Sequence, residues 1–364
     1  MTFDREELLS VLNDASPAVA RTAMLEGYKH FWFDNKNVYA YDGGLGIRLP
    51  LKTELDCGLP GKPLLELLKT STLKEVFLDQ VKDDVVLQMG KAKVTLVSLP
   101  GDIFFGEVVG EADKAGLWPF LLAGKPKGGT RVILSEAMVG AFNKLRFVRK
   151  SGGDQPMHHG ITLVAQKDKM ELYATDSRSL AQAVVEEEPP KGLERVIIPW
   201  GLVSCVLDLV EPGATLHIGD YLMVEGGDGV RLFSNLLEEQ SEPDLAVLAG
   251  KYRKAARDRA DLPPGLRPLL ERVSILAGEE DANGDLSCKG NILTLSGKYR
   301  LGAVNGNITL NGKLPNAAAR YNATVLMRGF GEANRFAMDA TSIMLFGDED
   351  RFMYIVAAVD GGAR

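Results

Sequence analysis

The chain has 364 residues, which exceeds one ordinary hydrophobic core and predicts two or three domains. Its composition, 45% hydrophobic and 25% charged, is typical of a globular protein, and its net charge of −7 excludes a protein that coats nucleic acid with its whole surface. An acidic body of this kind is still compatible with local basic stripes.

Cysteine usage and hydropathy indicate a cytoplasmic protein. Cys57, Cys205 and Cys288 lie far apart without C-x-x-C spacing, so we expect reduced thiols. Residues 1–9 are acidic and helix-like, which predicts no signal peptide. No run of about 20 apolar residues occurs, so we expect no membrane span.

The chain repeats one order of elements three times. Each repeat begins with an amphipathic helix, in which apolar residues recur at three- and four-residue steps. A hairpin of alternating strands follows, then a second helix, then further strands. The first helices are predicted at 3–15, 134–148 and 262–276, the hairpins at 29–51, 159–185 and 285–310, and the second helices at 60–71, 199–210 and 316–333.

The repeat is about 120 residues long, a period typical of a chain built from similar domains. Two joints separate the repeats. Residues 123–131 are rich in Gly, Lys and Pro, and residues 238–254 are expected to form an extended crossing strand.

Asp42 and Asp176 follow a predicted strand at the same place in the first two repeats, whereas the third repeat has residues 293–299 there. A turn residue is often duplicated between repeats, and a catalytic acid need not be. We therefore interpret both residues as Asx-type turns that bond their own backbone. The alternative is an acid or base at a repeat junction.

Other motifs that carry chemistry are weak. Residues 124–130 contain Gly and Lys without the spacing of a phosphate-binding loop, which indicates a basic linker. His158 and His159 are adjacent, and neighbours in a strand point to opposite faces, so no metal site is predicted. No Ser/His/Asp or Cys/His set and no dinucleotide fingerprint is present, and we expect neither an enzyme nor a cofactor.

Basic residues recur on or after the first helix of each repeat, in an otherwise acidic chain. Lys and Arg at comparable positions can contact phosphates without reading base sequence, although each could equally belong to a solvated helix face. These residues are Arg21, Lys29, Lys144, Arg146, Arg149, Lys150, Arg267 and Arg272.

The repeat order and four motifs together resemble the bacterial sliding clamp, the β subunit of DNA polymerase III. The motifs are the stretch "LYATDSRSLA" at 172–181 and the segments 95–105, 232–248 and 353–359. The resemblance covers nearly the whole chain.

This resemblance implies an α+β DNA-clamp fold of three similar domains, each with two helices and antiparallel sheets. The domains would span 1–125, 126–247 and 248–364. Two chains head to tail would form a homodimeric six-domain ring around duplex DNA, with helices lining the hole. The implied role is that of a processivity factor that holds the replicative DNA polymerase and is placed on DNA by a clamp loader.

The family also binds partner peptides in a hydrophobic pocket. Its wall would here consist of Thr175, Ser177, Arg178, Leu180, Pro243, Leu248, Ile355, Ala357 and Val359. The family has Gly-His-Arg after the Thr-Asp pair and a tail with Met and Pro, whereas this chain has Ser177-Arg178-Ser179 and residues 357–364 without either. We therefore expect a different ligand motif, as in a divergent or phage-encoded member. A protein-binding scaffold without DNA encirclement is the alternative function.

Overall fold

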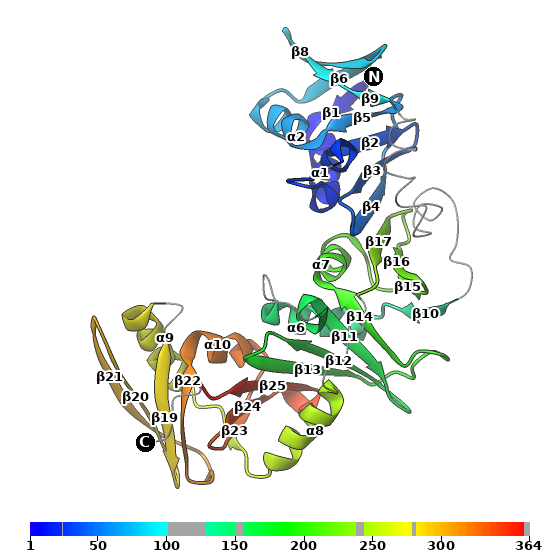
Figure 1. The fold of residues 1–364 in the computed structure, drawn as a ribbon. Helices are drawn as coiled ribbons and strands as arrows, with labels where there is room; N and C mark the ends of the chain where they lie inside the picture. The colour runs from blue at the N-terminus through cyan, green and yellow to red at the C-terminus, as the bar shows by residue number, and fades with distance from the viewer. Residues whose placement is uncertain (24, 101–128, 150–155, 238–243, 279–281, 360–364) are drawn as a thin grey trace. The chain divides into compact units, whose positions relative to one another are not determined.

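The computed structural model describes residues 1–23, 25–100, 129–149, 156–237, 244–278 and 282–359 (Figure 1). The chain forms two compact units. The first comprises residues 1–139, 190–192 and 198–237, and the second comprises the rest. Residues of the predicted middle domain, 126–247, are thus divided between the two units, so the boundaries of the three domains stay a prediction.

The first unit contains two antiparallel sheets. Sheet A has the strand order β1 (Thr2–Asp4), β6 (Glu75–Val81), β7 (Asp84–Met89), β8 (Ala92–Val97). Sheet B has the order β10 (Thr130–Ile133), β15 (Thr215–Ile218), β16 (Tyr221–Glu225), β17 (Arg231–Asn235), β4 (Leu45–Pro50), β3 (Asn37–Tyr41), β2 (His30–Asp34), β5 (Cys57–Pro60), β9 (Leu99–Pro100). The antiparallel pair β4 and β17 joins strands of the first and second repeats into one sheet.

The second unit is built in the same way. Sheet C has the order β14 (Arg195–Pro199), β11 (Gly160–Ala165), β12 (Met170–Thr175), β13 (Ser179–Val185), β25 (Phe352–Ala357), β24 (Ser342–Phe346), β23 (Arg335–Met338), β18 (Ala260–Asp261). Sheet D has the order β21 (Gly302–Thr309), β20 (Ile292–Tyr299), β19 (Asn283–Lys289), β22 (Ala317–Asn322). The pair β13 and β25 joins the second and third repeats.

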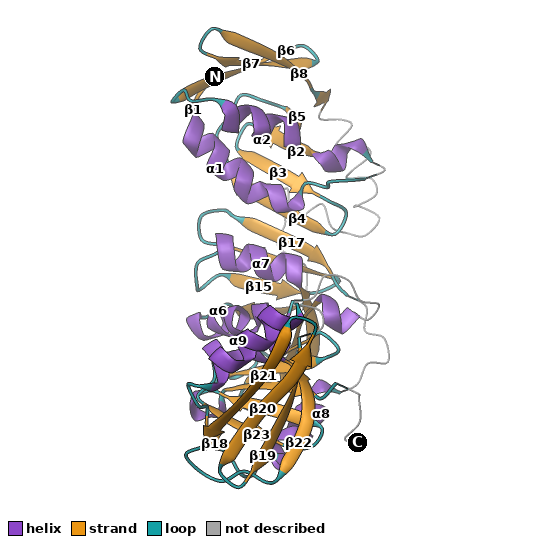
Figure 2. Ribbon diagram, turned by 90° about the vertical axis from the view of Figure 1, so that its left-hand side faces the viewer, coloured by secondary structure: helices purple, strands orange, loops and turns teal. Residues whose placement is uncertain are grey.

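Six α-helices occupy the two helix places of each repeat. They are α1 (Arg5–Ala15), α2 (Gly61–Thr70), α6 (Glu136–Leu145), α7 (Trp200–Leu209), α9 (Leu266–Ala277) and α10 (Ala323–Met327). In the first unit, α1, α2 and α7 lie on one face of sheet B (Figure 2). The order strand, helix, four strands, helix, three strands occurs three times, which confirms the predicted repeat.

Two predicted elements were wrong. Residues 316–333 were expected to form one helix, but β22 occupies their first part and α10 begins at Ala323. Residues 238–254 were expected to cross as a strand, but α8 spans Leu245–Ala255. Asp244 caps α8 by accepting bonds from the backbone N–H groups of Ala246 and Val247, and the segment holds no proline after that cap.

The stretch at 171–185 forms a β-turn between β12 and β13. The Asp176 carboxylate accepts bonds from the backbone N–H groups of Arg178 and Ser179, at 3.1 and 2.8 Å. Ser177 has a φ of 69°, the left-handed conformation such a turn requires. The second carboxylate oxygen lies 3.0 Å from Nη1 of Arg328. The turn interpretation of Asp176 is therefore confirmed.

The first repeat contains the same turn. Asp42 accepts bonds from the N–H groups of Gly44 and Leu45 at 2.9 and 2.7 Å. The third repeat has no aspartate between β20 and β21, as the sequence predicts, but Asp339 forms this turn one hairpin later, between β23 and β24. Such turns fix a hairpin through the backbone and leave the carboxylate engaged.

We expect Asp176→Ala to lower the free energy of unfolding by about 2–3 kcal/mol, because it leaves buried N–H groups and one side of an ion pair unsatisfied. Asp168→Ala, in an exposed hairpin turn, is the matched control and should change stability by less than about 0.5 kcal/mol. Thermal and urea unfolding would measure both variants. Equal stability of the two would contradict the turn's structural role.

Candidate functional site

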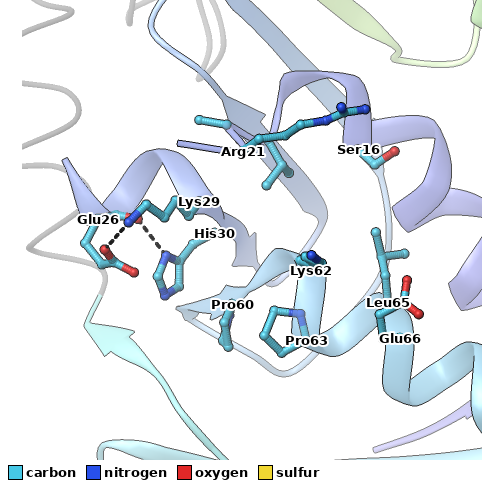
Figure 3. Close-up of a pocket in the computed structure, with 12 residues that line it drawn as sticks. Ser16, Arg21, Glu26, Lys29, His30, Pro60, Lys62, Pro63, Leu65 and Glu66 are labelled. Atoms are coloured by element: carbon cyan, nitrogen blue, oxygen red, sulfur yellow. Dashed lines mark hydrogen bonds and ion pairs between the residues drawn. The ribbon is translucent and has the colours of Figure 1, made fainter. Parts of the chain in front are cut away.

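A cavity of about 670 Å³ lies in the first unit between the end of α1 and the start of α2 (Figure 3). Two of the predicted DNA-facing residues, Arg21 and Lys29, line it together with Lys62 of α2. Arg21 comes from the segment after the first helix, and Lys29 ends the short 3-10 helix Glu26–Lys29. The fold thus gathers three cations that are distant in the sequence.

The three cations differ in their partners. Lys29 Nζ lies 2.8 Å from a carboxylate oxygen of Glu26, and this hydrogen bond lowers the pKa of Glu26. Arg21 and Lys62 form no ion pair with any residue that the structure describes. Their charges are therefore available to an anion, whereas that of Lys29 is largely compensated.

His30 lies at the back of this cavity. Its ring is buried, and Nδ1 is 2.8 Å from the backbone oxygen of Glu26 (Figure 3). Burial lowers the pKa of His30 below its ordinary value. The imidazole is accordingly neutral at pH 7, with Nδ1–H donating to the carbonyl, and the positive charge of the cavity comes from its arginine and lysines.

The other predicted DNA-facing residues are dispersed over several elements. Lys144 in the last turn of α6, and Arg146 and Arg149 after it, are exposed. Arg267 and Arg272 are exposed on α9, where Arg267 pairs with Glu271 at 3.1 Å. Lys150 lies outside the described residues. The exposure of these residues does not test a contact with DNA, so their assignment as DNA-facing residues stays a prediction.

The residues predicted for the peptide pocket lie on and around sheet C, and the structure brings three of the apolar ones together. Leu180 of β13 and Ile355 of β25 belong to one hydrophobic cluster, and Leu248 of α8 packs against it. Leu180 and Ile355 are only 5% and 3% exposed. These side chains thus form part of the packing between sheet C and α8, and the peptide pocket stays a prediction.

The polar members of that pocket belong to the turn at 176–179. Thr175 is buried and its hydroxyl donates to the backbone oxygen of Ser179 at 2.8 Å, while Ser177 and Arg178 are exposed. They form a rim at the end of β12 rather than part of the buried cluster.

The end of the chain supplies a second rim. Ala357 is exposed, and Val359 is half-buried with its N–H bonded to the backbone oxygen of Arg320 at 2.7 Å. Pro243 lies outside the described residues.

The two faces of β25 explain why α8 packs where it does. Met353 and Ile355 point to the α8 side of sheet C, whereas Phe352 and Tyr354 contact Phe147 on the other side, at ring distances of 6.3 and 5.0 Å. Figure 1 shows α8 and α10 on opposite sides of β23–β25. Sheet C is thus covered on both faces, as its unbroken apolar strands require.

The residues considered for other chemistry are not gathered into one site. His158 and His159 lie on a 3-10 helix rather than on a strand. The side chain of His158 is buried and that of His159 is exposed, so the two rings do not share one environment. The three cysteines are buried and form no disulfide, and burial raises the pKa of Cys57 to about 11. Within the described ranges, no group of His, Cys, Asp or Glu could hold a metal ion, and no helix is both long and apolar enough to cross a bilayer.

Sequence reasoning missed Lys62 and α8. Lys62 stands at the start of a correctly predicted helix, but the recurrence of basic residues at the first helices gives no signal for a cation on a second helix. The signal for α8 was present as Asp244 followed by Leu245, Leu248, Ala249 and Tyr252 at helical spacing.

No protein-family model and no curated protein sequence matches the chain. Solved structures match it over 99% of its length and 99% of theirs. They include a sliding clamp (DNA polymerase III subunit beta) from Bartonella birtlesii bound to griselimycin, with a TM-score of 0.81 and 15% identity. A putative DNA polymerase III beta subunit from Eubacterium rectale has a TM-score of 0.80 and 14% identity, and the beta subunit from Thermotoga maritima has 0.78 and 17%. The chain therefore has the fold of these sliding clamps.

We expect Leu245→Ala to destabilise the second unit by about 2–4 kcal/mol, because it opens a cavity in the cluster beneath α8. Val247→Ala on the same helix is the control, since Val247 is 69% exposed and its truncation should cost less than about 0.5 kcal/mol. Unfolding curves and hydrogen exchange of the α8 amides would report both effects. Unchanged protection in Leu245→Ala would contradict the packing of α8.

Proposed function

We propose that the chain is a DNA sliding clamp, in which two copies close head to tail into a ring around duplex DNA and hold a partner polymerase there. The observation that carries the proposal is the match to sliding clamps over 99% of both chains at a TM-score of 0.81. A partial match would fit a shared domain, but a match from end to end preserves the number and order of the repeated elements.

Ring closure is supported by the sheet edges. Sheet A ends on β8 and sheet D ends on β21, and neither strand has a neighbour on its outer side among the described residues. An exposed edge is usually protected by charge, proline or a bulge, because it otherwise pairs with another chain. The eight residues of β21 contain no charged side chain, and β8 contains only Lys93. Pairing of β8 with β21 of a second copy would satisfy both edges.

Exposed apolar side chains accompany these two edges. Val97 at the end of β8 is 72% exposed, and Ile275 of α9, the helix that packs on sheet D, is 74% exposed. Burial of such side chains at a subunit interface contributes about 25 cal/mol per Å² of apolar surface. Each of the two units thus offers a surface suited to a head-to-tail contact.

Arg21 and Lys62 support the DNA-binding part of the proposal. They are cations without an ion pair among the described residues, and they come from the segment after α1 and from the start of α2. Contacts of this kind would neutralise phosphates without reading the bases, while the acidic body disfavours binding elsewhere. Retention on DNA would then follow from the closed ring rather than from affinity.

We propose no catalytic role. Asp42 and Asp176, the aspartates that the sequence offers for acid–base chemistry, use their oxygens to hold turns. The partner polymerase would instead bind near the cluster that contains Leu180 and Ile355, with α8 as part of the contact surface.

Light scattering over a range of concentrations should give a mass near twice 39.5 kDa for the native chain. Val97→Lys combined with Ile275→Lys should give the monomer mass, because each change places a charge in the proposed interface. Val247→Lys is the matched control, because Val247 is also an exposed apolar residue, and it should leave the dimer intact. A native chain that stays monomeric at every concentration would overturn the ring.

Binding to DNA separates the clamp from a protein-binding scaffold. A nicked circular plasmid should retain the ring through gel filtration at high salt, and linearising the plasmid should release it. Two double variants should weaken duplex binding at low salt: Arg21→Glu with Lys62→Glu, and Arg146→Glu with Arg149→Glu. In each, the dependence of log K for duplex binding on log salt concentration should become shallower by about 1 per lost phosphate contact. Lys167→Glu with Lys313→Glu, in two exposed loops, is the control. Equal retention on circular and linear DNA would exclude encirclement.

A further inference from the structure

A second hollow, of about 660 Å³, lies in the second unit at the C-terminal end of α8. Its polar lining consists of five basic side chains and one carboxylate, that of Asp350. The five, here called the basic cluster, are Arg253, Lys254, Arg257, Arg259 and Arg335. This concentration of positive charge stands out in a chain whose net charge is −7.

Arg259 forms the fixed base of the basic cluster. Its Nη1 lies 2.6 Å from both carboxylate oxygens of Asp350, and its Nε donates to the backbone oxygen of Ala256 at 3.1 Å. Its guanidinium carbon is 3.8 Å from the centre of the Phe346 ring. The side chain is thereby held by an ion pair, a backbone bond and a cation–π contact.

Asp350 compensates only part of the charge. Arg335 lies 2.9 Å from the same carboxylate, so one negative charge is shared between two guanidinium groups. The hydrogen bond from Arg259 and the nearby positive charges lower the pKa of Asp350 and keep it ionised. Among the residues that the structure describes, no other carboxylate lines this hollow.

None of the remaining three cations forms an ion pair with a residue that the structure describes, although the charge of Arg253 helps to lower the pKa of Asp350. Arg253 donates to the neutral amide oxygen of Gln182 at 2.7 Å, and Lys254 and Arg257 are exposed. Arg253 and Lys254 in the last turn of α8 also complement the helix dipole, but that effect ends within one turn and does not account for Arg257, Arg259 and Arg335.

We propose that the basic cluster binds acidic side chains of a protein partner, as an extension of the partner surface on α8. This inference rests on the proposed function, in which a partner protein binds near α8, and it adds that the bound segment of the partner is acidic. The Asp350 carboxylate shows that the two fixed arginines accept a carboxylate in this hollow, and Arg253, Lys254 and Arg257 offer the donors for further ones.

The same helix favours a peptide over nucleic acid. Val247, 69% exposed, and the half-buried Leu248 lie in the first half of α8, where nucleic acid would gain nothing from an aliphatic surface. Val247 and Lys254 are seven positions apart, or about 10 Å along a helix, which an extended peptide covers in about three residues. The partner segment would therefore carry an apolar anchor and, about three residues away, two or more acidic residues.

The test uses the full chain and three fluorescein-labelled probes. The first is a peptide with two leucines, a two-residue Gly-Ser spacer and three glutamates; the second replaces the glutamates by glutamines; the third is a single-stranded oligothymidylate of equal charge. At low salt, the glutamate peptide should bind at least tenfold more tightly than the glutamine peptide and than the oligothymidylate.

The double variant Lys254→Glu with Arg257→Glu should lose this preference and bind the glutamate peptide about tenfold more weakly. The control variant, Lys167→Glu with Lys313→Glu, should retain the preference. Both changed cations are exposed, so the fold is expected to persist and thermal unfolding verifies it. Equal binding of the two peptides, or equal affinity in the double variant, would overturn the proposal. Tighter binding of the oligothymidylate would replace it with a nucleic-acid site.

Failure of this site and failure of the proposed ring give different results. The double variant should keep the two-chain mass and the duplex binding of the native chain, because neither of its residues lies on β8, on β21 or in the cavity beside α1 and α2. A monomeric native chain that still prefers the glutamate peptide would refute the ring alone.

Discussion

The structure depends on how its β-strand edges are satisfied. An antiparallel sheet leaves a row of backbone N–H and C=O groups at each edge, and a repeated domain presents such an edge at every junction. Here β4 pairs with β17 and β13 pairs with β25, so neighbouring repeats share one sheet. The compact units therefore do not coincide with the repeats. Among the described residues, the same rule leaves β8 and β21 as edge strands of sheets A and D, which is the basis of the proposed pairing with a second copy.

Sharing a sheet has a consequence for the surfaces of the second unit. β25 pairs on both sides, with β13 and β24, so its side chains point alternately to two covered faces. Tyr354 faces α10, where its hydroxyl donates to the backbone oxygen of Val325 at 2.9 Å, and Ile355 faces α8. A partner cannot reach the apolar side chains of this strand directly. In the proposed function a partner would therefore bind along α8 or at the rims, through the exposed residues of α8.

Local patterns predicted most of the fold. Five of the six repeated helices lie within the segments predicted from apolar spacing, and the turns at Asp42 and Asp176 follow from the preference of aspartate for bonding the backbone ahead of it. The failures have a different origin. Residues 317–322 form β22 because β19 offers them an edge, a contact that no local pattern contains. The cavity beside α1 and α2 was missed for the same reason, since Lys62 and Arg21 meet only through the fold.

The two groups of cations differ in the contacts that surround them, and this difference suits two kinds of anion. Arg21 and Lys62 stand on separate elements around an open cavity, an arrangement that tolerates many relative positions of a phosphate backbone. The basic cluster at the end of α8 contains arginines held by Asp350 and Phe346, an arrangement that favours planar carboxylates at defined positions. The proposed clamp function requires that DNA can move and that a partner is held. Loosely placed cations suit the first requirement, and fixed guanidinium groups beside an apolar helix face suit the second.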